Sequence, residues 1–281
     1  MIKDISVGQF FPGSSLLHKL DPRAKILILL VYIITLFLCK NFFSLIVLFI
    51  AAIVAVLISK ISFKVVLKGL KALIAIIVFT SLLQIFYNNE GDILWKPFAE
   101  KEFAITTGGV FTALFITLRI IALILASSLL TYTTSPTMLT DAIERLLSPL
   151  KVFKINVHSF AMMMTIALRF IPTLIEEVDI IMSAQKARGA GLETGSVKER
   201  AKALVPVFVP LFVNSFRRAV DLAFAMECRC YSGDGNRTRM RIMKFRITDW
   251  CVLGFSLLLT AGVLCTNIPE LGNIFIFQSV I

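Results

Sequence analysis

Two arginines occupy matching settings 41 residues apart and are the side chains of this chain best suited to bind a partner. The two motifs are Ala187-Arg188-Gly189 and Cys228-Arg229-Cys230. Small neighbours leave a guanidinium prominent, and its planar fork suits bidentate contact with carboxylates or backbone carbonyls. An arginine at a helix C-terminus also complements the helix dipole, which is the alternative interpretation of either one alone. Because the motif occurs twice, we favour a role for both arginines in docking a partner protein.

Charged side chains also gather in the middle of the two segments that end at these motifs. The acidic and basic members of the set are Glu176, Glu177 and Asp179, then Arg217, Arg218 and Asp221. Paired carboxylates can perform general acid–base chemistry. No nucleophile or metal ligand accompanies them, so the pattern favours ion pairs that hold two crossing helices together.

The sequence offers little for metal, cofactor or nucleotide chemistry. It has only two histidines, and its five cysteines are scattered, with a Cys228/Cys230 spacing that fits no zinc pattern. The sequence contains no Gly-rich loop followed by a lysine, the pattern that binds nucleotide phosphates. We therefore expect no catalytic residue, no metal site and no cofactor, and any ATP must be used by another subunit.

Long helices position the two arginine motifs. Ser135 and Pro136 begin an amphipathic helix that ends near Ser148. Two helices of roughly 30 residues follow, over about 156–188 with Pro172 inside and about 197–229 with Pro206 and Pro210 inside; each is about 45–50 Å long. Glycines follow both helices, as is common at helix C-termini.

The rest of the chain has the composition of a membrane protein. It is 57% hydrophobic with mean hydropathy +0.86 and only 17% charged residues, whereas soluble domains average about 25%. Such stretches cross a bilayer as helices of about 20 residues. The candidate spans are Ile26–Cys39, Phe43–Ile58, Ala72–Tyr87, Ile105–Tyr132 and Trp250–Thr266. The fold class predicted is an all-α polytopic membrane protein with about five transmembrane helices plus long cytoplasmic coupling helices.

The distribution of basic residues predicts the orientation of these spans. Residues 133–248 hold seventeen of the twenty-nine lysines and arginines, and a cytoplasmic N-terminus with five crossings puts 25 of them inside. The tail after Thr266 is then external, and Lys60–Lys71 forms a basic interfacial helix. We divide the chain into a membrane region (1–134), a cytoplasmic or interfacial coupling region (135–248) and a last span with its tail (249–281). No pattern typical of nucleic-acid binding accompanies the net charge of +11.

Four stretches in order along the chain resemble the transmembrane T component of energy-coupling factor transporters, the family that includes the cobalt-type Q subunits. They are 15–25 (SLLHKLDPRAK), 187–190 (ARGA), 206–219 (PVFVPLFVNSFRRA) and 225–231 (AMECRCY). Cys228 departs from the alanine usual in the family, but cysteine is also small. The resemblance spans nearly the whole chain.

The resemblance implies a function that composition could not show. In this family the T component is a non-catalytic scaffold in a prokaryotic plasma membrane, and it links two ABC ATPase subunits to a small substrate-binding membrane subunit. Arg188 and Arg229 would dock into the ATPases, with their small neighbours as close-packed flanks. The apolar run 204–213 would face the substrate-binding subunit. ATP binding and hydrolysis would thereby drive uptake of a vitamin or a transition-metal ion.

Two other classes of function stay open at this stage. A self-sufficient secondary transporter would predict related halves and interrupted, charged helices at mid-membrane, and neither feature is visible. A membrane-bound enzyme would need a cluster of histidine, acidic or cysteine side chains at the interface. Specificity in the family belongs to the partner subunit, so the sequence does not indicate the transported substrate.

Overall fold

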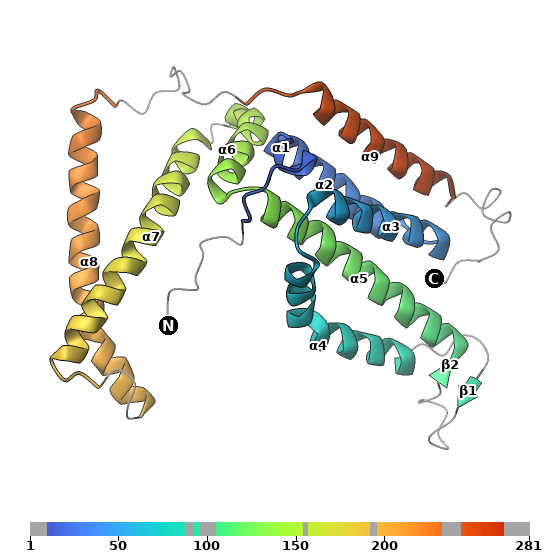
Figure 1. Ribbon diagram of the computed structural model, residues 1–281, viewed down its shortest axis with the longest axis horizontal. Helices are drawn as coiled ribbons and strands as arrows, with labels where there is room; N and C mark the ends of the chain where they lie inside the picture. The colour runs from blue at the N-terminus through green and yellow to red at the C-terminus, as the bar shows by residue number, and fades with distance from the viewer. Residues whose placement is uncertain are drawn as a thin grey trace. The chain divides into compact units, whose positions relative to one another are not determined.

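The computed structural model describes residues 10–87, 93–95, 105–153, 157–191, 196–231 and 243–266, and apart from one short strand pairing its elements are helices (Figure 1). The α-helices are α1 (Leu16–Lys19), α2 (Pro22–Leu38), α3 (Phe42–Ser59), α4 (Phe63–Tyr87), α5 (Thr107–Thr133), α6 (Pro136–Leu146), α7 (Val157–Ala187), α8 (Val197–Glu227) and α9 (Ile247–Thr266). A 3₁₀ helix covers Ser148–Phe153, and β1 (Ile93–Trp95) pairs antiparallel with β2 (Ile105–Thr106). The predicted all-α polytopic fold class is confirmed.

Polar side chains at several helix starts explain where those helices begin. The Asp21 carboxylate accepts a hydrogen bond from the Arg23 N–H (2.9 Å) at the start of α2, with Pro22 in the first turn. Thr106 caps α5 by accepting from the Gly109 N–H. At α8, Ser196 and Glu199 form a reciprocal capping box. Each cap satisfies backbone donors that have no partner inside the helix.

Two compact units make up the chain, and the first joins residues 9–135 to residues 243–281. Its core lies between α2, α3, α5 and α9, where side chains from all four helices are buried together. The buried members are Leu36, Cys39, Leu45, Leu48, Phe115, Ala122 and Val263. Hydroxyl pairs link these helices as well, as between Thr35 and Thr260 (2.8 Å) and between Ser44 and Thr266 (2.6 Å).

Large apolar side chains cover the outer faces of this unit. Phe37, Leu57 and Phe79 are each 60% exposed or more. So much exposed apolar surface would be unfavourable in water, whereas a bilayer accepts it. We therefore treat the residues 9–135 and 243–281 as the membrane unit.

Helix length and apolarity alone select five described helices that could cross a membrane, and these differ in part from the predicted spans. The five lie in α3, α5, α7, α8 and α9. The two parts of α4, Phe63–Lys71 and Leu73–Tyr87, are bent by 56° and would make a sixth. That bend separates the predicted interfacial helix from the predicted span that follows it. With 17 residues, α2 is shorter than these five helices and is not among them, although the sequence predicted a span there.

The second unit, residues 136–242, contains α6, α7 and α8. Both long helices have 31 residues, and neither ends at its internal prolines, Pro172, Pro206 and Pro210. At 1.5 Å per residue each is about 46 Å long. Their bounds agree with the predicted ranges within two residues. Whether they cross the membrane or lie at its surface is not decided by composition, so their role as cytoplasmic coupling helices stays a prediction.

Candidate functional site

The end of α7 presents Arg188 through a defined backbone motif. Gly189 adopts a left-handed conformation (φ 83°), and its N–H donates to the Lys186 carbonyl (3.0 Å). The Ala190 N–H donates to the Gln185 carbonyl (3.0 Å). This pair of bonds is a Schellman motif, which satisfies the last carbonyls of a helix. Arg188 is the residue immediately before the left-handed turn.

The end of α8 repeats the same motif around Arg229. Cys230 is left-handed (φ 56°), and its N–H donates to the Glu227 carbonyl (2.8 Å). The Tyr231 N–H donates to the Met226 carbonyl (3.0 Å). Arg229 therefore has the backbone position that Arg188 has in α7. The sequence predicted two arginines ending two helices, and the structure gives both the same type of turn.

Both arginines are exposed, as are the four small residues beside them. Within the residues that the structure describes, neither guanidinium has an ion pair or a side-chain hydrogen bond. A guanidinium carries five N–H donors and no acceptor. With small neighbours, each arginine can reach into a shallow acidic or carbonyl-lined groove of another protein.

Glu177 is the centre of the polar contacts between α7 and α8. Its Oε1 accepts from the Asn214 amide (2.6 Å), and its Oε2 lies 2.8 Å from an Arg218 guanidinium nitrogen. The Glu177 side chain is only 13% exposed. Further along, the Gln185 amide reaches the Pro206 carbonyl at 3.5 Å. These contacts fix α7 and α8 as an antiparallel pair (Figure 1).

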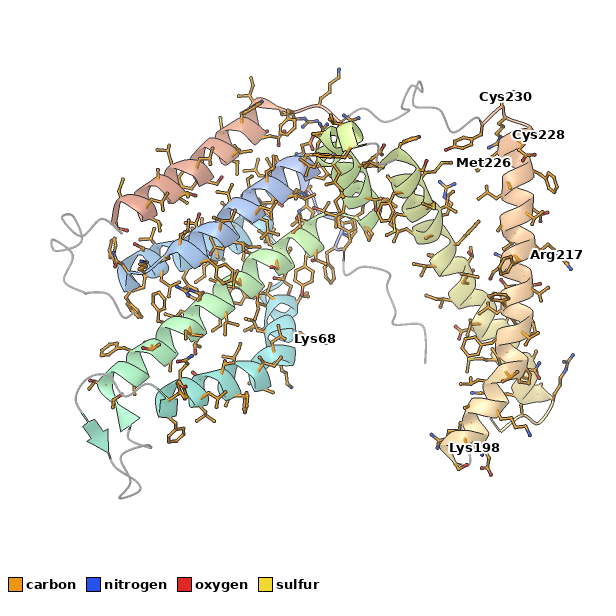
Figure 2. All side chains as sticks on the ribbon, turned by 180° about the vertical axis from the view of Figure 1, so that it is seen from behind. Lys68, Lys198, Arg217, Met226, Cys228 and Cys230 are labelled. Atoms are coloured by element: carbon orange, nitrogen blue, oxygen red, sulfur yellow. The ribbon has the colours of Figure 1, made fainter. Side chains whose placement is uncertain are left out.

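Of the six charged residues expected to hold this crossing, the structure brings together Glu177 and Arg218. Glu176 and Arg217 are exposed, and the Arg217 side chain points away from α7 (Figure 2). Among the described residues, Glu176, Asp179, Arg217 and Asp221 form no ion pair. Asn214 was not anticipated from the sequence, although it lies four residues before Arg218 and so on the same helix face.

The antiparallel arrangement places the two arginine motifs at opposite ends of the helix pair. Arg188 lies 11 residues beyond Glu177 on α7, and Arg229 lies 11 residues beyond Arg218 on α8. Each motif is thus about 16 Å from the crossing along its helix, which separates the two by about 30 Å. Cys228 and Cys230 mark the Arg229 end in Figure 2, and Lys198 marks the start of α8.

The two histidines have local partners, and neither forms part of a metal-binding cluster. His158 Nδ1 contacts Glu144 Oε1 at 3.0 Å, which joins α7 to α6. His18 contacts the Ser15 hydroxyl at 2.7 Å and the Phe11 carbonyl at 3.0 Å. The described residues contain no group of three or more histidine, cysteine or acidic side chains that could hold a metal ion.

Most of the chain matches one known protein family. The family model for the cobalt transport protein CbiQ matches residues 13–240, a range that includes α1, the membrane helices α2–α5 and both arginine motifs. The chain therefore belongs to the CbiQ cobalt transport protein family, as the sequence predicted.

Individual relatives show which members of this family the chain resembles. The chain is 46% identical to the energy-coupling factor transporter transmembrane protein EcfT of Ruminiclostridium cellulolyticum, over 94% of this chain and 97% of that protein. It is 48% identical to EcfT of Clostridium kluyveri, over 89% and 92%, and 44% identical to EcfT of Bacillus subtilis, over 94% and 98%. The chain is thus similar along nearly its whole length to transmembrane proteins of energy-coupling factor transporters.

Proposed function

We propose that this protein is the non-catalytic transmembrane scaffold of an energy-coupling factor transporter in a prokaryotic plasma membrane. It joins two ABC ATPase subunits to a small substrate-binding membrane subunit. The ATPases supply the energy, and the scaffold passes their movement on through α7 and α8. The family match and the EcfT relatives support the class of transporter. The matched arginine motifs that follow α7 and α8 support two docked partners of one kind.

The observation that carries the proposal is the matched presentation of Arg188 and Arg229. Helix ends with the same type of turn, about 30 Å apart, suit two equivalent grooves on two copies of one kind of partner. Exposed guanidinium groups with small flanks allow a groove lined by carboxylates or carbonyls to close around them. A scaffold that docks an ATPase dimer needs two such sites.

The apolar side of α8 supports a place for the substrate-binding subunit. Phe208, Phe212 and Phe216 follow one another at four-residue spacing, and each is 58–65% exposed. The rings of Phe212 and Phe216 lie 4.7 Å apart. Such a row on the helix that leads into Arg229 gives a membrane subunit an apolar contact that moves with the docking motif. Transported substrates of this class are vitamins or transition-metal ions, and the choice belongs to that subunit.

Affinity purification of the tagged chain from mild-detergent extracts of its native membrane tests the proposal. Mass spectrometry should find one or two ABC ATPases and at least one small membrane subunit. Arg188→Ala and Arg229→Ala should each reduce the recovered ATPase severalfold, and the double variant should abolish it. The amount of chain in the membrane should not change.

Arg217→Ala is the matched control, because Arg217 is an exposed arginine of α8 far from the helix end. It should recover ATPase as the parent chain does. A well-folded parent chain that brings down no ATPase would overturn the proposal. Equal losses from all three arginine variants would instead show that general positive charge, rather than the two motifs, holds the partner.

A further inference from the structure

Both ends of the segment that carries α6, α7 and α8 are fastened to one short stretch of the membrane unit. The chain leaves that unit after Ser135 and returns to it at Met243. Three residues of the stretch Asp21–Lys25, at the start of α2, contact these two points. All of the contacts lie inside the membrane unit.

Lys25 holds the exit of the chain. Its ammonium donates to the Thr133 carbonyl (3.0 Å) and to the Thr134 hydroxyl (3.1 Å). Thr133 is the last residue of α5, and α6 begins three residues later at Pro136. Lys25 is only 8% exposed and Thr134 only 3%. A buried ammonium is costly unless its donors are satisfied, so this arrangement tightly constrains the backbone at Thr133 and Thr134.

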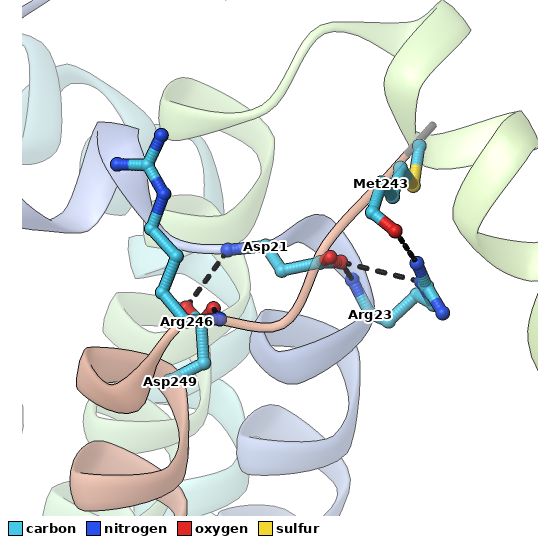
Figure 3. A network of polar contacts seen from close by, with 5 residues as sticks. All are labelled: Asp21, Arg23, Met243, Arg246 and Asp249. Carbon is cyan, nitrogen blue, oxygen red and sulfur yellow. Dashed lines mark hydrogen bonds and ion pairs between the residues drawn. The ribbon is translucent and has the colours of Figure 1, made fainter. Parts of the chain in front are cut away.

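Arg23 and Asp249 hold the return of the chain (Figure 3). The Arg23 guanidinium donates to the Met243 carbonyl (2.9 Å) and lies over the Phe245 ring at 5.1 Å. Asp249 is fully buried, and its two oxygens accept from different segments. Oδ2 accepts from the Arg246 N–H (2.7 Å) before α9.

The second oxygen of Asp249 closes the connection to α2. Oδ1 accepts from the Asp21 N–H (3.0 Å), 228 residues earlier in the chain. The Asp21 carboxylate in turn lies 3.4 Å from Arg23 and caps α2. The segments before α6 and before α9 are therefore both bonded to the first turn of α2.

We propose that Arg23, Lys25 and Asp249 form a clasp that makes the membrane unit follow the movement of the coupling segment, the part of the chain that carries α6, α7 and α8. Without the clasp, the stretches Thr134–Ser135 and Met243–Arg246, where the chain leaves and rejoins the membrane unit, could rotate and absorb that movement. With it, displacement of either connection pulls directly on α2 and α9. The three are positioning residues for coupling, and their role rests on the proposed function.

The test uses the complete complex with its ATPases and compares hydrogen exchange with and without ATP plus vanadate. In the parent complex, ATP should change exchange in α7 and α8 and also at the starts of α2 and α9. Lys25→Met should keep ATP hydrolysis within about twofold of the parent rate. The ATP-dependent change at α2 and α9 should fall by more than half.

Two gentler variants guard against loss of folding in Lys25→Met. Thr134→Val removes one acceptor of Lys25 at nearly constant shape, and Asp249→Asn removes the charge and replaces one of the two acceptor oxygens by an NH2 group. Both should reduce the transmitted change while ATPase recovery stays normal. Lys19→Met is the control, since Lys19 is exposed on the neighbouring α1, and it should behave as the parent does.

The outcomes separate the two proposals. A parent complex that lacks ATPases overturns the proposed function and the clasp together. Suppose that Lys25→Met, Thr134→Val and Asp249→Asn all show normal ATPase recovery and the full ATP-dependent change at α2 and α9. That result overturns the clasp alone. A purely structural role would lower thermal stability without separating ATP hydrolysis from the transmitted change, and that result would also contradict the clasp.

Discussion

Cys230 holds the backbone in a left-handed conformation (φ 56°) immediately after Arg229. That conformation costs a residue with a Cβ about 1–2 kcal/mol, while glycine adopts it freely. Cys230→Gly should therefore stabilise the end of α8 by about 0.5–1 kcal/mol, after its entropy cost in the unfolded chain. Hydrogen exchange of the Cys230 and Tyr231 amides measures the local free energy of opening.

Gly189→Ala, at the matching position after α7, should have the opposite effect and destabilise the helix end. Gly189 has φ 83°, and an added Cβ would meet no other atom within 4 Å. The penalty is then one of backbone conformation alone, about 1 kcal/mol of local destabilisation. If both substitutions changed local opening in the same direction, the two helix ends would not share the geometry described above.

Single residues also show what the sequence could not predict. Arg119 has no identifiable acidic partner in the sequence, which favours a packing or interface role without naming its contacts. It donates to the Cys39 carbonyl (2.7 Å) and lies over the Phe115 ring at 4.6 Å. Asp249 is an acidic residue in the first turn of an apolar helix, a position that the helix dipole alone would explain. Its bond to the Asp21 N–H depends on two helices meeting, and no local pattern indicates which ones meet.

At the scale of helices, the sequence predicted where the coupling segment begins, turns and ends. Ser135-Pro136, the glycine after Arg188 and the apolar periodicity placed α6, α7 and α8 within a few residues of their bounds. Helix ends depend on the capping residues nearby in the sequence, so a short stretch of sequence is enough to predict them. The partner of Glu177 depends on how α7 and α8 cross. Six charged residues were candidates, and the crossing selects Glu177 and Arg218 together with the unanticipated Asn214.

The α7–α8 crossing should depend on Glu177 more than on its neighbour. Glu177→Ala leaves the Asn214 amide without its acceptor and Arg218 without its carboxylate. We expect a local destabilisation of about 1–2 kcal/mol, most of it from the amide, because Arg218 is 43% exposed and its ion pair is screened. Hydrogen exchange of the α8 amides around Asn214 gives the free energy of local opening.

Glu176→Ala is the control for that substitution, since Glu176 is exposed and adjacent on the same helix. It should change local stability by less than about 0.5 kcal/mol. In a double-mutant cycle, Glu177→Ala and Asn214→Ala should be non-additive. Additive losses would mean that the two side chains do not interact in the membrane-bound protein.

At the scale of the whole molecule, the proposed docking of both arginine motifs restricts how α7 and α8 can lie. The pair is antiparallel, with Arg188 at one end and Arg229 at the other. If both helices crossed the bilayer, the two arginines would face opposite sides of the membrane, and only one could meet a cytoplasmic ATPase. The location of the C-terminus would be the same in both arrangements, because two added crossings do not change which side it is on. The side on which each motif lies therefore decides between them.

Cysteine labelling in intact cells measures that side. Two chains carry one cysteine each at the motif ends. One has all five native cysteines replaced and Lys198→Cys, near the Arg188 end; the other retains Cys228 and has the remaining four replaced. We expect both to resist a membrane-impermeant thiol reagent until the cells are permeabilised, because the basic segment 133–248 favours the cytoplasmic side. Lys40→Cys, in the predicted external connection between α2 and α3, should react in intact cells. Reaction of only one of the two motif-end cysteines in intact cells would show that α7 and α8 span the bilayer and that paired docking is impossible.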